Sequence, residues 1–569
     1  MMLNLIDKIG DWNPQLLREL KGRLKLFPVA IALVTSVATQ LIIFLYQLRE
    51  LPSKYYSSYG KYCNLKDLEK FNKTLEFCPT NQIDMQLWWR DHWEYMFLSL
   101  SVIFIFTLLV AGTYLIVNDL AQEERSGTLN FIRLSPQSET SIFTGKLLGV
   151  PVLIYLVVIA AIPLHILTGK LANIALSYIL FFYLTLVANC IFFYSIALLF
   201  GVFGGRAFSG FKPWLASGLV MLFLMMTISM SHSNIHYSYA WLTIFSPISM
   251  TDYLFPNLFN RYYDPILHDL QFFNLPLGES SVSLLTLHLL NYTLGTYWAW
   301  QGLKRCFRNP NATIFSKQQS YLIVANFEIM LFGFFISENY SSSRNLFYGI
   351  QVLYLWNILL FVGLLAVVLP HRQAIQDWAR FRYQKVANSE NYRKNYLLSE
   401  LMVGEKTPAT LAIAINLFIA ASGFFVLILN AKINNFDNTY QTLGFAGILL
   451  FISSTMIYGS IAQIMLMLKN SKRALWAAGA TGVAIIIPTL ILSILNISAS
   501  NRDYLASLLW LFTSGFWYGV KNSTVSTILT VFLCQLMIAA LLNWYLIKQV
   551  KSAGESATKA LFSQSNVKI

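Results

Sequence analysis

Residues 27–48 read FPVAIALVTSVATQLIIFLYQL, an apolar run without a single acidic or basic side chain. An α-helix rises about 1.5 Å per residue, so about 20 apolar residues cross the roughly 30 Å hydrocarbon core of a bilayer. Few soluble helices are apolar on every side over such a length. This stretch therefore predicts a helix that spans a membrane.

Comparable runs recur along the whole chain and set its class. The protein has 569 residues, of which 56% are hydrophobic and 12% charged, whereas soluble domains carry about 25% charged residues. This composition excludes soluble, disordered, collagen-like and disulfide-scaffold proteins. We predict an all-α polytopic transmembrane helical bundle of about 12 spans, at residues 27–48, 95–117, 150–167, 174–200, 213–230, 283–303, 321–337, 347–369, 409–429, 441–467, 475–495 and 525–546.

The distribution of basic residues predicts how the bundle is oriented. The net charge of +14 would suit nucleic-acid binding, but lysines and arginines cluster in alternate loops between the runs, which excludes nucleic acid as the expected partner. If the N-terminus is cytoplasmic, 28 of the 41 lysines and arginines fall on that side, as the retention of basic loops in the cytoplasm requires. We therefore expect a multi-pass protein of the plasma (inner) membrane with both termini cytoplasmic.

Two apolar aromatic segments on the predicted outer side are too short to cross. They lie at 241–247, before the sixth span, and at 505–520, before the twelfth. Each can dip into the membrane as a re-entrant segment or anchor at the headgroup level through its tryptophans and tyrosines. The sequence leaves both interpretations open.

The first 26 residues predict a helix on the membrane surface. Asn13 and Pro14 provide an N-cap and a first-turn proline. Leucines then recur at helical spacing opposite basic residues, as in a basic amphipathic helix that lies on the lipid of the inner leaflet. This helix serves either as a simple membrane anchor or as a docking surface for a partner.

The twelve spans divide into two sets of six. Residues 27–305 form the first six-span domain, with outer loops 49–94 and 231–282 and an inner segment 118–149; residues 306–569 form the second, with an inner loop 370–408. Six crossings return the chain to its starting side, which predicts a parallel 6+6 repeat. A competing sequence similarity, between residues 16–20 (LLREL) and 397–401 (LLSEL), would instead align the first span with the ninth.

The inner segment 118–149 predicts a short helix that projects from the membrane. Ser126-Gly127 breaks the extension of the second span, Thr128 is placed to cap a short helix, and Ser138 is placed to cap the next one. A short helix with exposed apolar side chains suits the groove of a partner protein. The alternative is an ordinary intracellular hairpin.

The same segment resembles the signature of ABC-2-type permeases, the membrane subunits of ABC exporters. The resemblance lies in EERSGTL at 123–129, LSP at 134–136 and GK at 145–146, and the order of elements agrees over about residues 13–305. It implies a coupling helix that docks on a separate ATP-binding cassette subunit and drives alternating access of an exporter. The implied coupling residues are Glu123, Glu124, Arg125, Gly127, Thr128, Leu129, Ser135, Pro136 and Lys146.

The second half departs from this signature. Its inner loop 370–408 contains no matching EERSGTL run. The second half is then either a second permease domain or an accessory bundle. In the latter case a second permease chain would complete the transporter.

The sequence contains no ATP-binding machinery of its own. A phosphate-binding loop needs Gly-Lys followed by Ser or Thr, whereas Lys146 and Lys170 are each followed by leucine. We expect this chain to have no enzymatic activity, no catalytic residue, no metal site and no cofactor. ATP and magnesium would be bound by the partner subunit.

Three ionisable residues and two cysteines complete the candidates. Glu328, in the seventh run, is a candidate intramembrane polar site, and a proton-coupled secondary transporter that uses it is one alternative function. A non-transporting membrane scaffold is another. His165 and His288 are weaker candidates. A disulfide between Cys63 and Cys78 would contribute about 3 kcal/mol if the outer side is oxidising, and two free thiols are the alternative.

Overall fold

The computed structural model describes most of the chain and consists almost entirely of helices. The described residues are 8–51, 62–63, 83–207, 212–231, 237–259, 267–309, 311–336, 343–388, 397–430, 438–470, 472–498 and 504–565. Most of the predicted outer loop 49–94 lies outside them, as do parts of 231–282 and 370–408. One two-residue hairpin, β1–β2, is the sheet within the described part.

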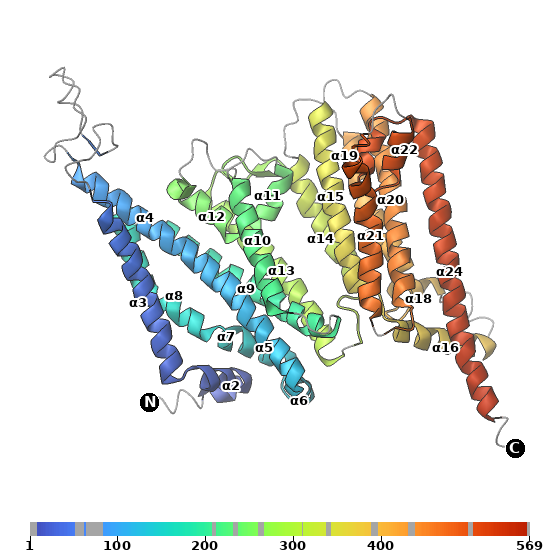
Figure 1. The fold of residues 1–569 in the computed structure, drawn as a ribbon, viewed down its shortest axis with the longest axis horizontal. Helices are drawn as coiled ribbons and strands as arrows, with labels where there is room; N and C mark the ends of the chain where they lie inside the picture. The colour runs from blue at the N-terminus through green and yellow to red at the C-terminus, as the bar shows by residue number, and fades with distance from the viewer. Residues whose placement is uncertain are drawn as a thin grey trace.

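The first half is built from long helices joined by short ones (Figure 1). Its elements are α2 (Pro14–Arg23), α3 (Leu26–Arg49), α4 (Met85–Phe106), η4 (Thr107–Ala111), α5 (Gly112–Ser126), α6 (Thr128–Leu134), α7 (Glu139–Gly149), α8 (Val152–Leu171), α9 (Leu176–Ala207), α10 (Pro213–Ser231), α11 (Tyr237–Ile244), α12 (Pro247–Leu254), η5 (Pro256–Phe259), β1 (Gln271–Phe272), β2 (Leu275–Pro276) and α13 (Ser281–Arg308).

The second half continues in the same manner. Its elements are α14 (Lys317–Ile336), α15 (Ser343–Val368), α16 (Arg372–Asn388), α18 (Leu397–Val403), α19 (Thr410–Asn430), α20 (Asn438–Leu466), α21 (Arg473–Ile494), α22 (Tyr504–Leu511), α23 (Phe516–Val520) and α24 (Val525–Ser565).

Eleven helices of the described part are long and apolar enough to cross a membrane. Among the predicted spans, 283–303 is the one missing from these eleven, although it forms the 28-residue helix α13. In Figure 1, α2 and the C-terminal end of α24 lie at the same end of the helices. An even number of crossings has this result, which supports α13 as the twelfth.

The end at which α2 and α6 lie is called the basal end below. The helices α16 and α18 lie there too, whereas α11, α12 and α22 lie at the opposite end (Figure 1). Thus each half has short helices at the basal end after its second long helix. Each also has a pair of short helices before its last one, α11–α12 and α22–α23. This shared order agrees with the 6+6 register, and the duplication itself stays a prediction.

Two hydrophobic cores meet at α14. Phe334 of α14 belongs to the core of the first half, while Leu331 and Phe335 belong to that of the second. The β1–β2 hairpin packs on the same helix, where the Phe273 amide donates to the Gly333 carbonyl at 2.8 Å. Helix α14 therefore joins the two halves.

A π-helical turn, η4, interrupts the second predicted span. Tyr194 of α9, fully buried, donates its hydroxyl to the Leu108 carbonyl at 2.7 Å. We expect Tyr194→Phe to lower the free energy of unfolding by about 1 kcal/mol, because one buried hydrogen bond is lost. Thermal unfolding in detergent measures this, and Tyr297→Phe, at an exposed tyrosine, is expected to change nothing. Equal loss in both variants would contradict it.

The cysteine prediction is confirmed in part. Cys63 is disulfide-bonded, whereas Cys190, Cys306 and Cys534 form no disulfide within the described part of the chain. Cys78 lies outside the described residues. The Cys63–Cys78 pairing therefore stays a prediction.

Candidate functional site

The break after α5 is made by the backbone of Gly127. Its φ is +75°, a left-handed conformation that glycine adopts without strain. Gly127 is also the N-cap of α6, so the prediction that Thr128 caps this helix is wrong. Thr128 is instead the first residue of α6, and its hydroxyl donates back to the Glu123 carbonyl at 3.3 Å. The glycine thus turns the chain sharply out of α5.

Helix α6 has one buried and one exposed apolar face. Leu129 and Ile132 pack into the first-half core. Phe131 and Leu134 are 78% and 85% exposed. Contiguous exposed apolar patches commonly mark a contact with a protein or a membrane.

The return from α6 to α7 is fixed at several points. Ser135 has an extended backbone, as a residue before proline should. The Ser138 hydroxyl accepts from the Ser141 amide at 3.2 Å, which confirms its predicted capping role. Arg308, at the end of α13, pairs with Glu139 at 2.8 Å. Helix α6 is therefore held on a braced turn.

The N-terminal helix α2 packs on α7. Asn13 caps α2, as predicted, by accepting from the Leu16 amide at 2.9 Å. Its side-chain amide also donates to the Ser141 carbonyl of α7 at 2.8 Å. A Cβ at Gly145 would lie 2.7 Å from the Leu16 nitrogen, and one at Gly149 would lie 2.5 Å from the Glu19 Cβ. Two glycines thus allow the helices to touch.

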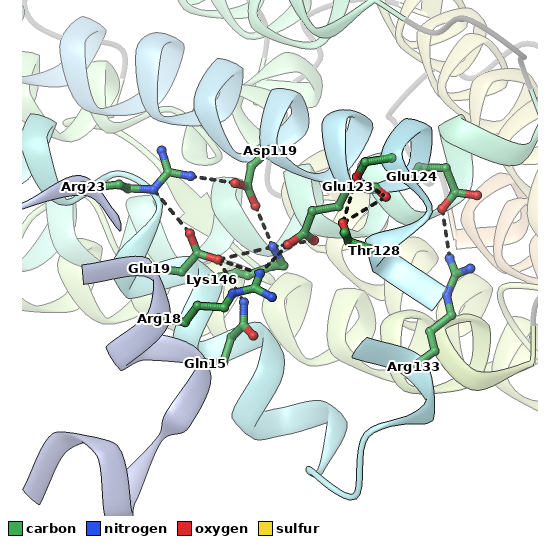
Figure 2. A network of polar contacts seen from close by, with 11 residues as sticks. Gln15, Arg18, Glu19, Arg23, Asp119, Glu123, Glu124, Thr128, Arg133 and Lys146 are labelled. Carbon is green, nitrogen blue, oxygen red and sulfur yellow. Dashed lines mark hydrogen bonds and ion pairs between the residues drawn. The ribbon is translucent and has the colours of Figure 1, made fainter. Parts of the chain in front are cut away.

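Lys146 stands at the centre of a polar cluster that we call the lysine network (Figure 2). Its side chain is 1% exposed, and its Nζ lies 2.6 Å from Asp119 Oδ2, 2.7 Å from Glu123 Oε2 and 3.6 Å from Glu19 Oε1. The network unites α2, α5 and α7 through Gln15, Arg18, Glu19, Arg23, Asp119, Glu123 and Lys146.

The charges of this network balance. Arg23 pairs with Asp119 at 2.6 Å and with Glu19 at 3.3 Å, and Arg18 pairs with Glu123. Burial lowers the pKa of Lys146, but the charges of Asp119, Glu123 and Glu19 outweigh burial and raise that pKa above its ordinary value. The ammonium therefore stays charged throughout the physiological pH range.

The same carboxylates resemble a metal site in their spacing. Glu19, Asp119 and Glu123 offer oxygens within 4.8 Å of one another. Because the Lys146 ammonium already contacts these oxygens, it supplies the positive charge that they require. The arrangement is better explained as a structural joint than as a metal centre.

The predicted coupling residues thus divide into three groups. Glu123 and Lys146 are buried in the lysine network, and Glu124 pairs with Arg133 at 3.3 Å beside α6 (Figure 2). Arg125 and Pro136 are exposed at either side of α6. Gly127, Thr128, Leu129 and Ser135 shape or seat the short helix. The large apolar side chains that α6 exposes are Phe131 and Leu134, and neither is among the implied coupling residues.

Sequence reasoning also missed the α2 side of the network. Glu19 is the acidic residue inside an otherwise basic amphipathic helix. That exception was the available signal, since an acidic residue on a buried face requires a cationic partner.

The remaining ionisable candidates lie elsewhere in the bundle. His165 Nε2 lies 2.8 Å from the Ser101 hydroxyl and its Nδ1 lies 2.7 Å from the Tyr183 hydroxyl. His288 contacts the Tyr292 hydroxyl at 3.1 Å. These are contacts of core histidines. Glu328 is buried beside Asn357 on α15.

The second half has a different element at its basal end. Glu400 of α18 accepts from Trp378 and Arg382 of α16, at 3.1 and 2.9 Å. Lys317, at the start of α14, donates to the carbonyls of Leu401 and Pro408 at 2.7 and 3.0 Å. In the described part of this half, no glycine with a positive φ separates a long helix from a short one.

Comparison with protein-family models, curated proteins and solved structures finds no match to this chain. Its class rests on its own features: it is an all-α, multi-pass membrane protein.

Proposed function

We propose that this chain is the membrane-spanning subunit of an ATP-driven transporter of the ABC-2 exporter type, and that α6 receives force from a separate ATP-binding subunit. The observation that carries the proposal is the exposure of Phe131 and Leu134 on a helix whose other face is locked into the core. ATP and magnesium would be bound by that partner, with the basal end in the cytoplasm.

The bracing of α6 supports a mechanical role. Its N-terminal end continues from α5 and hence from the second predicted span. The lysine network fixes the end of α5 to α2 and α7. A displacement imposed on Phe131 and Leu134 would therefore move the helices that cross the membrane rather than bend a loop. Alternating access requires such rigid transmission.

The test is co-purification of an ATP-binding cassette protein with the tagged chain. We expect Phe131→Asp with Leu134→Asp to weaken that binding at least tenfold, because burying each of these side chains contributes about 1.5–3 kcal/mol. Stimulation of the partner's ATPase activity should fall with it. The matched control is Gln122→Asp, at an exposed position of α5, which should keep both.

Two results would overturn the proposal. One is transport into vesicles without any ATP-binding protein. The other is full ATPase coupling by the doubly substituted chain, shown to be folded by its unchanged unfolding temperature.

A further inference from the structure

A carboxyl group is buried within the seventh predicted span, at the junction of the halves. Glu328 of α14 is 4% exposed, and Asn357 of α15 is fully buried. Asn357 Nδ2 lies 3.5 Å from Glu328 Oε2 and donates to the Leu353 carbonyl at 3.2 Å. The proposed coupling at α6 does not involve Glu328 or Asn357.

Two oxygens of this pair lack a donor. Glu328 Oε1 and Asn357 Oδ1 are both buried and, within the described part of the chain, have no hydrogen-bond partner. The oxygen of an ionised carboxylate and the oxygen of an amide can accept a hydrogen bond but cannot donate one. Buried polar atoms in a membrane need partners, since no water replaces them. One additional hydrogen between the two groups would correct both deficits.

No nearby cation supplies it in the described structure. The titratable groups near α14 whose side chains the structure describes are engaged elsewhere. Lys317 and Tyr321 donate to carbonyls of the 401–408 segment, Tyr354 donates to the Gly444 carbonyl, Lys521 lies over the Tyr348 ring, and Glu400 accepts from Arg382. An ionised Glu328 would thus be an unpaired charge inside the membrane, which is costly.

We propose that Glu328 is a proton-binding site: it holds a proton on Oε1 and donates it to Asn357 Oδ1, while Asn357 Nδ2 donates to Oε2. The acid and the amide then form a closed pair with two hydrogen bonds. The ligand is a proton taken up from water, and its loss returns it to water and leaves the carboxylate.

The position of the pair links its protonation to the contact between halves. Trp241 of α11 packs with its ring centroid 4.8 Å from that of Phe327 and 6.1 Å from that of Trp356. These residues adjoin Glu328 and Asn357 in sequence. Withdrawal of α11 from α14 and α15 would admit water to the junction, and hydration favours the ionised form. Proton release then accompanies separation of the halves.

Infrared spectroscopy of the full chain in vesicles tests this directly. A protonated carboxylic acid has a carbonyl band distinct from that of a carboxylate, and the band shifts in D₂O. We expect the difference spectrum of wild type against Glu328→Gln to contain one such band, lost as the pH is raised. Glu94→Gln, at a carboxylate that accepts from Asn257 at 2.8 Å, should leave the band in place.

Further variants keep the test decisive. The amide introduced by Glu328→Gln can keep the same paired geometry, so this variant should fold, whereas Glu328→Ala should be less stable. Asn357→Leu should shift the carbonyl band by removing its hydrogen bonds, and Trp241→Ala should make the band disappear at lower pH. Absence of the band from wild type at neutral pH, or its persistence in Glu328→Gln, would overturn the proposal. Neither result depends on an ATP-binding partner.

Discussion

Replacing Lys146 with methionine is expected to lower the free energy of unfolding by about 3–5 kcal/mol, the usual cost of removing one partner from a buried ion pair. The variant keeps much of the side-chain volume but removes the ammonium from among Glu19, Asp119 and Glu123. Their oxygens lie within 4.8 Å of one another, so repulsion that Arg18 and Arg23 offset only in part would push α2 away from α5. Thermal or denaturant unfolding in detergent measures the loss.

The control for this variant is Lys170→Met, which removes an exposed lysine at the end of α8 and should leave stability unchanged. Adding Asp119→Asn to Lys146→Met should recover part of the loss, because one of the three negative charges disappears. Equal stability of Lys146→Met and Lys170→Met would contradict the role assigned to the lysine network.

The pH dependence of the Lys146 effect follows from the direction of its pKa shift. The folded-state pKa of Lys146 is raised, so the contribution of the ammonium is fully present below the unfolded lysine pKa of about 10.4. It is lost only as the pH rises through the higher folded value. The difference between wild type and Lys146→Met should therefore be constant from about pH 6 to about pH 9.

The spans and two of the three predicted caps could be predicted because their causes are local. A membrane span is recognised by its apolar length alone, and Asn13 and Ser138 cap helices whose first turns adjoin them in sequence. Helix α13 shows that mean hydropathy alone can miss a helix long enough to cross the membrane. It carries His288 and Asn291, both buried, and such polar residues lower the mean hydropathy of a helix whose length still suffices to cross.

The lysine network could not be predicted because its partners are distant in sequence. Lys146 and Glu19 are 127 positions apart, and only the packing of α2 on α7 brings them together. The sequence resemblance assigned Lys146 to a partner contact, whereas the side chain is 1% exposed. The pattern identifies a segment of the chain, but which of its residues face outward depends on how α5 ends at Gly127.

Placing alanine at both Gly145 and Gly149 is expected to detach α2 from α7, with a loss of about 3 kcal/mol in the free energy of unfolding. Each overpacked site costs about 1–3 kcal/mol. The added Cβ at Gly145 would meet the backbone nitrogen of Leu16, which cannot rotate away. The Asn13 bond to the Ser141 carbonyl and the contact of Lys146 with Glu19 would be lost together. Protease cleavage near residue 25 and the unfolding temperature report the two effects.

Gly218→Ala in α10 is the matched control because no atom lies within 4 Å of its added Cβ. Glycine inside a helix is about 1 kcal/mol less favourable than alanine, so this variant should be slightly more stable than wild type. The same substitution is thus expected to act with opposite signs at α7 and α10. If alanine at positions 145 and 149 also stabilised the protein, these glycines would not be needed for the packing of α2 on α7. Helix α2 would then have to be held by the lysine network and the Asn13 contacts.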